Sequence, residues 1–220
     1  MRVAEISLAF SRPWTFRVPL LTRQLEAKYV DAFFADGTLR LSSFDVFRKH
    51  PDELRRDEQE GRIHMEITGP NSSAAVVAIN GQEAYVMCAS TIEAALPTDG
   101  SVSAFRILDT LNFANAISAQ IPGFLGGTEG LCSYRDNTML RKTDPRPFEP
   151  PLEGADVEKW FEEHDRRIGK HSIDAFFVKE SRFSHEAEYR FIWFASGLHR
   201  DYIDIKCPAA RQFCERVWRP

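Results

Sequence analysis

The stretch from Tyr189 to Phe194 reads YRFIWF and is the most apolar, aromatic run of the chain. Aromatic and β-branched residues favour strands, and an apolar run of this length fits the centre of a sheet. The residues just before it, from Ser184 to Glu188, read SHEAE and are mostly polar. The sequence therefore predicts a central strand with charged side chains at its entry.

Further strands and helices are predicted on both sides of this run from alternation, helical spacing and capping residues. The predicted strands are Phe16–Leu20, Thr38–Ser43, Arg62–Thr68, Ala74–Ile79, Ala84–Ser90, Val102–Leu108, Leu131–Tyr134, Ala175–Val178 and Tyr202–Ile205. The predicted helices run from an N-cap at Thr22 to Asp36, from Asp109 to Ser118 with Asp109 or Thr110 as the N-cap, from Asp156 to Ile168, and through Ala210–Val217.

Turn residues divide these elements. Asn80-Gly81 lies between two apolar runs and predicts a hairpin between the strands that flank it. Gly69-Pro70-Asn71 is a second turn signal, and Gly37 is suited to a left-handed helix cap. The stretch PGFLGGTEG (122–130) favours a glycine-rich bend, and the prolines between Asp144 and Gly154 favour an extended loop.

The order of elements predicts an α+β fold with a mixed, mostly antiparallel sheet. Strands and helices do not alternate regularly, which counts against doubly wound nucleotide-binding folds. The chain has 220 residues with no linker-like stretch, so we expect a single domain over residues 1–220. Its 17 Phe, 4 Trp and 5 Tyr supply enough apolar area to exclude a disordered chain.

Composition also limits the partners. There are 28 Lys and Arg against 32 Asp and Glu, and this balance excludes a strong electrostatic nucleic-acid binder at the level of the whole chain. No apolar run is long enough to cross a membrane, and the first residues do not resemble a signal peptide. We therefore expect a cytoplasmic protein with reduced cysteines, although the sequence leaves a Cys207–Cys214 bridge open.

Several motifs of known chemistry are missing. The glycines between 123 and 130 lack the Lys-Ser/Thr of a P-loop, and no G-x-G-x-x-G joins a strand to a helix. Zinc-binding Cys/His sets and the G-x-S-x-G turn of serine hydrolases are also missing from the sequence. No metal site is predicted.

One charged cluster leads into the central strand. Within a strand, Glu186, Glu188 and Arg190 point to the same face. Burying Glu188 beside Arg190 is costly unless the charges are paired or used. The cluster is either a cross-strand salt bridge at the sheet edge or a carboxylate pair placed near a developing positive charge.

A second charged stretch, RKHPDELRRDEQEGR, runs from Arg48 to Arg62. A run of this kind is typical of a solvated loop or short helix. It also follows the end of a predicted strand, where active-site loops are common. The alternative interpretation is therefore that this charged block orders over a ligand.

Taken together, six segments resemble an uncharacterised bacterial family, the domain of unknown function numbered twenty-nine seventy-one. They are TFRVP, DGTLRLSSFDVFR, RRDEQEG, YVMCAS, GGTEGLCSY and FFVKESRFSHEAEYRF, and the resemblance covers roughly Phe16 to Phe194. In that family an early basic strand, an L-x-L-S-S strand, a Cys-x-Ser segment and a late Lys followed by E-x-E-aromatic-R recur. This resemblance implies an organisation and no reaction.

The order of Arg, Ser and E-x-E is distantly similar to that of ADP-ribosyltransferases. This similarity implies that Arg17 binds NAD, that Ser90 braces the nicotinamide side, and that Glu188 is catalytic with Glu186 as its acceptor-activating companion. The chain has Cys88-Ala89-Ser90 where the family has two hydroxyl residues. The similarity also implies an ADP-ribosyltransferase-like fold with NAD as substrate.

Two further arginines are assigned to the same site as hypotheses. Arg48 would join Arg17 in binding phosphate, because the planar guanidinium binds oxygens in pairs. Arg190 either joins them in binding NAD or neutralises Glu188.

Three functions remain open from the sequence. The first is an NAD-consuming transferase or glycohydrolase, a toxin or anti-phage defence factor that modifies a protein or nucleic acid. The second is a non-catalytic module on the same fold that senses a nucleotide or a phage protein. The third is a nucleic-acid-directed protein that stacks bases on Trp14, Phe44 and Trp160.

Overall fold

The structure is a computed structural model. It describes residues 20–49, 51–52, 56–70, 73–79, 84–93, 95–136, 139–143, 157, 159–160, 162–163, 166, 173–197 and 200–217. The predictions for Arg17, Trp14, the loop 144–154 and most of the strand 16–20 and of the helix 156–168 lie outside these residues.

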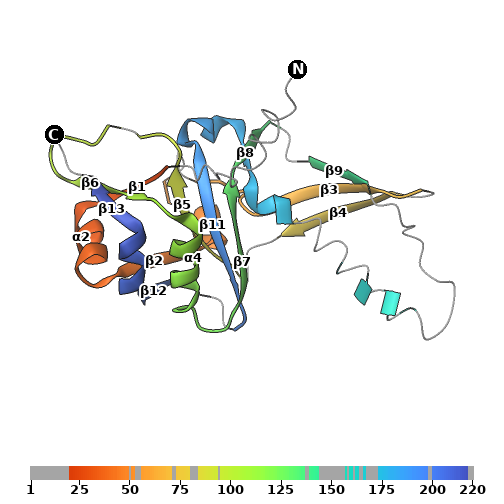
Figure 1. Ribbon diagram of the computed structural model, residues 1–220. Helices are drawn as coiled ribbons and strands as arrows, with labels where there is room; N and C mark the ends of the chain where they lie inside the picture. The colour runs from red at the N-terminus through yellow and green to blue at the C-terminus, as the bar shows by residue number, and fades with distance from the viewer. Residues whose placement is uncertain are drawn as a thin grey trace, which may run out of the picture.

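An eight-stranded sheet forms the main body of the molecule (Figure 1). Its strands are β1 (Leu21–Glu26), β2 (Thr38–Ser43), β5 (Ala84–Ser90), β6 (Val102–Ile107), β7 (Phe124–Leu131), β11 (Glu188–Ala195), β12 (Tyr202–Lys206) and β13 (Cys214–Val217). All their pairings are antiparallel. Two smaller sheets contain the parallel pairings, so the mixed, mostly antiparallel α+β prediction is confirmed.

Helices and short 3-10 segments cover the sheet and connect its strands. They are α2 (Ala27–Asp36), α3 (Phe44–Arg48), α4 (Thr110–Ser118), η1 (Ile173–Phe177), η2 (Ser181–Glu186) and η3 (Pro208–Phe213). Among the described residues, no helix is long and apolar enough to span a membrane. All four cysteines are free, which answers the open question of a Cys207–Cys214 bridge.

Strand β5 has an unusual set of neighbours. Along one edge it pairs with β11 over its whole length, from Glu188 opposite Ser90 to Phe194 opposite Ala84. Its other edge is shared: β2 pairs near the start of β5, at Tyr85 and Val86, and β1 pairs only at Ser90, through Thr22. β1 and β2 therefore share one edge of β5 and pair with different parts of it.

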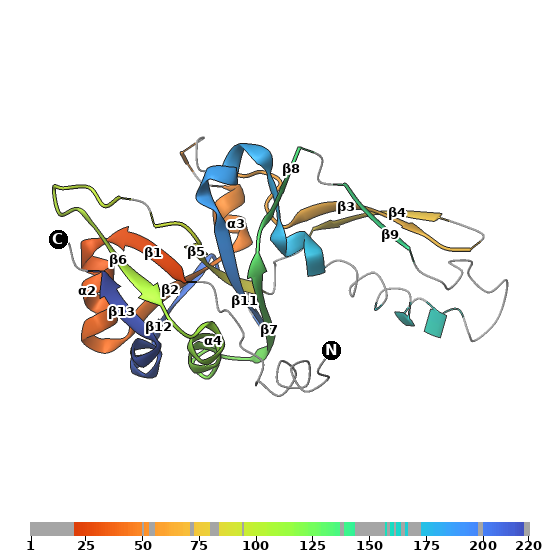
Figure 2. The ribbon, with the colours of Figure 1, turned by 45° about the horizontal axis from the view of Figure 1, so that its top comes forward.

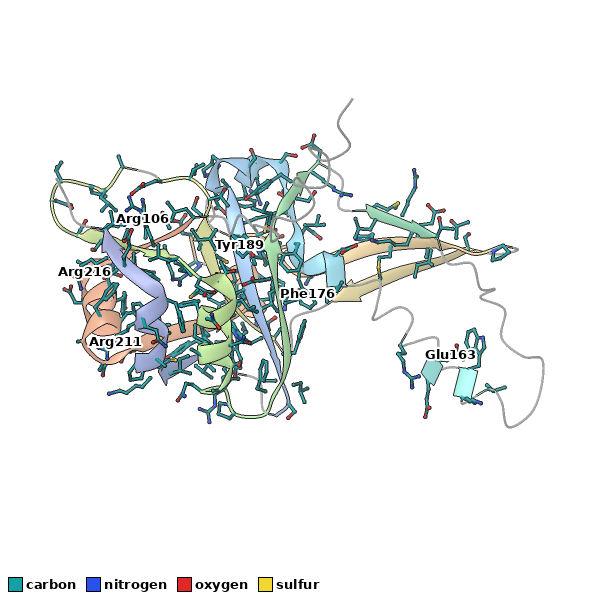
Figure 3. All side chains as sticks on the ribbon, viewed as in Figure 1. Arg106, Glu163, Phe176, Tyr189, Arg211 and Arg216 are labelled. Atoms are coloured by element: carbon teal, nitrogen blue, oxygen red, sulfur yellow. The ribbon has the colours of Figure 1, made fainter. Side chains whose placement is uncertain are left out.

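The two faces of β11 differ in chemistry. Phe191 and Trp193 pack into the larger apolar core, and the Trp193 indole donates to the Ala114 carbonyl of α4 at 3.1 Å. Tyr189, labelled in Figure 3, belongs to the same face. On the opposite face, Ile192 packs in a smaller core with Phe44, Phe176, Ala84 and Val86. The predicted central strand is therefore confirmed, with Glu188 and Arg190 on the face of the smaller core.

The glycine-rich stretch is a strand and not the predicted bend. Residues 124–131 form β7 and pair with β11. A Cβ at Gly127 would lie 2.9 Å from the backbone oxygen of Ile192, and one at Gly130 would lie 3.4 Å from the Phe177 ring. These glycines allow close approach of neighbouring atoms, a role that a local reading cannot distinguish from turn formation.

The predicted helix start at Thr22 is also wrong. Leu21–Glu26 is strand β1, which pairs with β6 along its length, and helix α2 starts only at Ala27. The pairing with β6 overrides the local helical spacing. The predicted end of this helix is confirmed, since Gly37 is a left-handed cap with φ of 80°. Asp109 is confirmed as the N-cap of α4.

The predicted hairpin around Asn80-Gly81 is not formed. Strand β4 (Ser73–Ile79) pairs with β3 (Arg62–Thr68), whereas β5 lies in the main sheet. The hairpin is instead between β3 and β4, on either side of Gly69-Pro70. With β9 (Met139–Thr143) these strands form a three-stranded sheet that extends away from the main body (Figure 2).

Two more segments differ from their predicted type. Ala175–Val178 is mostly the 3-10 segment η1, and the strand β10 (Val178–Glu180) follows it and pairs with β8 (Ser133–Arg135). Figure 3 shows Phe176 of η1 between the main body and the three-stranded sheet. The predicted final helix is η3 followed by strand β13, which pairs with β6.

Candidate functional site

A pocket of about 490 Å³ lies over β5 and the start of β11, next to β1 and helix α3. Its described lining residues are Thr22, Arg23, Gln24, Phe44, Phe47, Glu60, Val86, Cys88, Ala89, Ser90, Ile92, Lys179, His185, Glu186, Glu188 and Arg190. Charged groups and apolar groups share this lining, as in most small-molecule sites. The pocket therefore collects Ser90, Glu186, Glu188 and Arg190 of the residues proposed from the sequence.

Strand register explains why Ser90 and Glu188 meet. Glu188 is the first residue of β11 and lies opposite Ser90, the last residue of β5. On the other edge of β5, Ser90 lies opposite Thr22 of β1. Three strands that are far apart in sequence thus end side by side at the pocket.

Glu186 reaches the site by a different route from the one predicted. The sequence places Glu186 and Glu188 in one strand, but Glu186 ends the 3-10 segment η2. Ala187 between them has φ of 44°, a left-handed conformation that is costly for a residue with a Cβ. This strained residue turns the chain so that both carboxylates still face one partner.

That partner is Lys179 of β10. Its Nζ donates to Glu186 Oε2 at 2.5 Å and to Glu188 Oε2 at 2.8 Å. The ammonium also lies over the Phe183 ring, 4.6 Å from its centre. Lys179 is absent from the sequence-based set of site residues. A signal was present, because Lys179 matches the late Lys that precedes E-x-E in the resembled family.

Arg190 holds Glu188 from the other side. Its Nε donates to Glu188 Oε1 at 2.6 Å, and its Nη1 donates to the Phe176 carbonyl at 2.5 Å. Nη1 also lies 2.7 Å from Oε1 of Glu60, from the charged block. The guanidinium is 1% exposed. These contacts favour the sequence-based alternative in which Arg190 neutralises Glu188.

Glu60, Lys179, Glu186, Glu188 and Arg190 thus form one continuous ion-pair network. Only Glu186 has an appreciably exposed side chain, at 37%. The charged block does not simply form the solvated loop that its composition favours, because Asp57 and Glu60 are each only 3% exposed. Glu60 of this block is buried because it pairs with Arg190 of β11.

Burial and the neighbouring charges act in opposite directions on the pKa values of this network. Burial alone raises the pKa of Glu188, but Arg190 and Lys179 outweigh it and hold that pKa well below its usual range. Burial alone lowers the pKa of Lys179, but Glu188 and Glu60 raise it above its usual range. For Glu60 burial dominates and raises the pKa to about 7.

Ser90 and its neighbours fasten the loop that carries the two glutamates. The Ser90 hydroxyl donates to the Glu186 carbonyl at 2.8 Å and accepts from the Ile92 amide at 3.2 Å. The Thr91 amide donates to the Ala187 carbonyl at 2.9 Å. The Tyr134 hydroxyl accepts from the Glu188 amide at 2.7 Å. Ser90 therefore orders the loop while its side chain lines the pocket.

Cys88 occupies the position of the first hydroxyl residue in the transferase motif to which the sequence is distantly similar. Its side chain lies on the pocket face of β5, and burial raises the pKa of its thiol well above the usual value. The thiol also hydrogen-bonds Glu188. The raised pKa favours the protonated thiol, which is a poor nucleophile.

Arg23 of β1 is a pocket arginine that the sequence analysis did not identify. Its Nη1 donates to the Cys88 carbonyl, and its Nε is buried without a hydrogen-bond partner in the described part of the chain. Burial lowers the pKa of its guanidinium. The sequence did hold a signal that Arg23 is not helical, because a basic residue is unfavourable in the first turn of the helix predicted from Thr22.

The other two proposed arginines are not among the described lining residues of this pocket. Arg17 lies outside the described residues. Arg48 ends helix α3, where it pairs with Asp45 and donates to the Glu60 carbonyl at 2.7 Å. The structure does not bring Arg48 into the described pocket lining. Arg48 instead holds the segment that carries Glu60, through its hydrogen bond to the Glu60 carbonyl.

Two aromatic residues of α3, Phe44 and Phe47, also line the pocket. Phe44 is fully buried, and Phe47 of the same helix is partly exposed. In the described part of the chain, His, Cys, Asp and Glu do not gather in a set of three that could hold a metal ion. The site thus offers carboxylates, an arginine and aromatic faces for binding and chemistry.

A comparison of the chain with protein-family models, curated proteins and solved structures finds no match.

Proposed function

We propose that this pocket binds NAD and that the protein is an NAD-consuming ADP-ribosyltransferase or NAD glycohydrolase. One observation carries the proposal: Arg23, Ser90 and Glu188 come from three neighbouring strands and line one pocket. This is the Arg, Ser, Glu order to which the sequence is distantly similar. Arg23 takes the place that the sequence similarity assigned to Arg17.

The proposed reaction breaks the bond between the ribose C1′ and the nicotinamide nitrogen. The bonding electrons pass to the pyridinium ring, neutral nicotinamide leaves, and positive charge develops on the ribose. Glu188 is ionised and fixed in place, so it stabilises this charge without reorganising. An acceptor oxygen then forms the new bond to C1′ and loses its proton.

Glu186 is suited to receive that proton. It is the most exposed carboxylate of the network, and its carbonyl is held by Ser90. Proton transfer to a positioned carboxylate is worth about 10²- to 10⁴-fold in rate. With water as acceptor the outcome is NAD hydrolysis, and with a protein or nucleic acid it is ADP-ribosylation.

Arg23 is suited to bind the pyrophosphate. Its planar guanidinium presents paired donors, and its buried Nε has no described hydrogen-bond partner. Phe47, which also lines the pocket, offers a partly exposed ring against which a heteroaromatic ring of the ligand can pack.

An NAD-consuming activity in a small protein that resembles a bacterial family would suit a toxin or an anti-phage defence factor. In that role the acceptor would be a macromolecule, a protein or a nucleic acid, in the cytoplasm. This part of the proposal rests on analogy alone.

A second candidate is a non-catalytic module that senses a nucleotide or a phage protein. It is favoured by the burial of Glu188, which is 5% exposed and bound by two cations. In this alternative the two ion pairs of Glu188 order the pocket, and Glu188 takes no part in a reaction.

NAD consumption by the purified protein distinguishes the two candidates. Wild type is compared with Glu188→Gln, with and without cell extract and nucleic acid. Glu129→Gln is the control, because Glu129 lies on the other side of the sheet, where it accepts from Thr110. NAD loss in wild type and the control but not in Glu188→Gln supports the enzyme. NAD binding without turnover supports the sensing module, and neither binding nor turnover refutes the NAD site.

A further inference from the structure

Glu60 is a pocket carboxylate to which the proposed reaction assigns no role. It lies just before β3 and is 3% exposed. Its Oε1 lies 2.7 Å from Nη1 of Arg190, and its carbonyl accepts from Arg48. A buried carboxylate in a pocket is a recurrent feature of sites that control charge.

Arg190 connects Glu60 to Glu188. The same guanidinium donates from Nε to Glu188 at 2.6 Å and meets Glu60 through Nη1. The Phe176 carbonyl accepts from Nη1 and fixes its orientation. Water is excluded from this contact, so the charge of Arg190 is divided between two carboxylates with little screening.

The surroundings of Glu60 place its protonation within the neutral pH range. Burial raises its pKa to about 7, Arg190 and Lys179 oppose that rise, and Glu188 and Asp57 add to it. Six titratable or charged groups surround the Glu60 carboxylate. They are Asp57 of the same segment, Arg48 of α3, Cys132 between β7 and β8, Lys179 of β10, and Glu188 and Arg190 of β11.

We propose that Glu60 is a positioning residue for Glu188 that acts through Arg190. When Glu60 is ionised, the positive charge of Arg190 is shared between the carboxylates of Glu60 and Glu188. When Glu60 is protonated, Glu188 alone neutralises the charge of Arg190. The consequence for catalysis rests on the proposed function: Glu188 then stabilises the ribose cation less, and NAD turnover rises as pH increases through neutrality.

The coupling can be measured without NAD. The Nε–H resonance of Arg190, assigned by triple-resonance NMR, is followed from pH 5.5 to 8.5. We expect it to shift with a midpoint near the Glu60 pKa of about 7, and to lose this shift in Glu60→Gln. The control Glu129→Gln should keep the wild-type shift, because Glu129 contacts Thr110 and not Arg190.

A resonance that does not move in wild type, or that still moves in Glu60→Gln, overturns the inference. If Glu60→Gln does not fold, the carbon-13 resonance of the Glu60 carboxyl in wild type replaces it. That signal must titrate with the same midpoint as Arg190, and a different midpoint overturns the inference. NAD turnover is assayed separately, so an inactive protein with an intact Arg190 shift refutes the proposed function alone.

Discussion

The Nζ of Lys179 lies 2.8 Å from Oε2 of Glu188, and both side chains are buried. The same nitrogen lies 2.5 Å from Oε2 of Glu186. One cation therefore holds the two glutamates of the E-x-E motif, even though they do not share a strand. The contact sets the spacing of the carboxylates on which the proposed chemistry depends.

Removing the Lys179 charge should destabilise the protein strongly. Lys179→Met leaves two carboxylates without their common partner, and breaking a buried ion pair costs about 3–5 kcal/mol. Lys179→Arg keeps the charge and should lose less. Urea denaturation measures both. The control is Lys28→Met, since the Lys28–Glu26 pair is exposed and its loss should leave the midpoint unchanged. Equal midpoints for Lys179→Met and wild type would contradict the role of the contact.

The contribution of Glu188 to stability should depend on pH. Its pKa in the folded state lies below the usual value of 4.5, so the folded protein holds the ionised form more readily than the unfolded chain. Its contribution is therefore present above about pH 4.5 and is lost as pH falls. The stability difference between wild type and Glu188→Gln should be largest at pH 7 and shrink toward pH 3.

Urea titrations at several pH values measure that difference. Glu66→Gln is the matched control, because the Glu66–Arg141 pair is exposed and should show little pH-dependent difference. A Glu188→Gln difference that stays constant down to pH 3 would show that Glu188 is not held ionised by the network.

Relieving the strain at Ala187 should raise stability and lower activity. Its φ of 44° costs a residue with a Cβ about 1–2 kcal/mol, whereas Gly adopts this region freely. After the entropy of Gly is subtracted, Ala187→Gly should stabilise by up to about 1 kcal/mol. If the site consumes NAD, turnover should fall because the glutamates are held less firmly.

Thermal unfolding and NAD turnover test this pair of effects. Ala119→Gly is the control, since Ala119 has φ of −66° and gains nothing from Gly. It should destabilise the protein. If Ala187→Gly destabilises the protein as much as Ala119→Gly does, the left-handed conformation of Ala187 does not lower the stability of the folded state.

Two adjacent glycines of β7 should respond differently to alanine. A Cβ at Gly127 would meet the Ile192 carbonyl at 2.9 Å, and backbone on both strands would have to shift. We expect Gly127→Ala to cost about 1–3 kcal/mol. No atom lies within 4 Å of a Cβ at Gly126 in the described structure, so Gly126→Ala should be neutral or slightly stabilising. Denaturation midpoints compare them, and equal losses would contradict the close β7–β11 approach.

Arg23 should matter for binding NAD. Arg23→Gln removes the charge and should weaken binding about tenfold or more, a loss of about 1.4 kcal/mol per factor of ten. Calorimetric titration with NAD measures the affinity. Arg106→Gln is the control, because Arg106 pairs with Glu93 and Glu215 on the surface. Arg17→Gln, measured in parallel, tests the arginine that the sequence similarity selected. Unchanged affinity in Arg23→Gln would remove Arg23 from the proposed site.

Local sequence was sufficient for elements whose signals are short-range. The aromatic run at Tyr189–Phe194 identified the central strand, and Gly37 and Asp109 identified a helix end and a helix start. Each depends on the backbone preferences or hydrogen bonds of a few neighbouring residues. The E-x-E pair could be selected as site residues for the same reason, because its charges directly precede an apolar strand.

Tertiary structure alone decided which residues join that pair. Lys179, Arg23 and Glu60 come from separate segments, and strand pairing brings them to one pocket. The strand character of Leu21–Glu26 depends on β6, and that of Phe124–Leu131 depends on β11. Hydrogen bonds between distant strands outweigh the weaker local preferences for helix and turn. The sequence by itself thus determined the central strand and its glutamates, whereas long-range pairing decided their ionic partners.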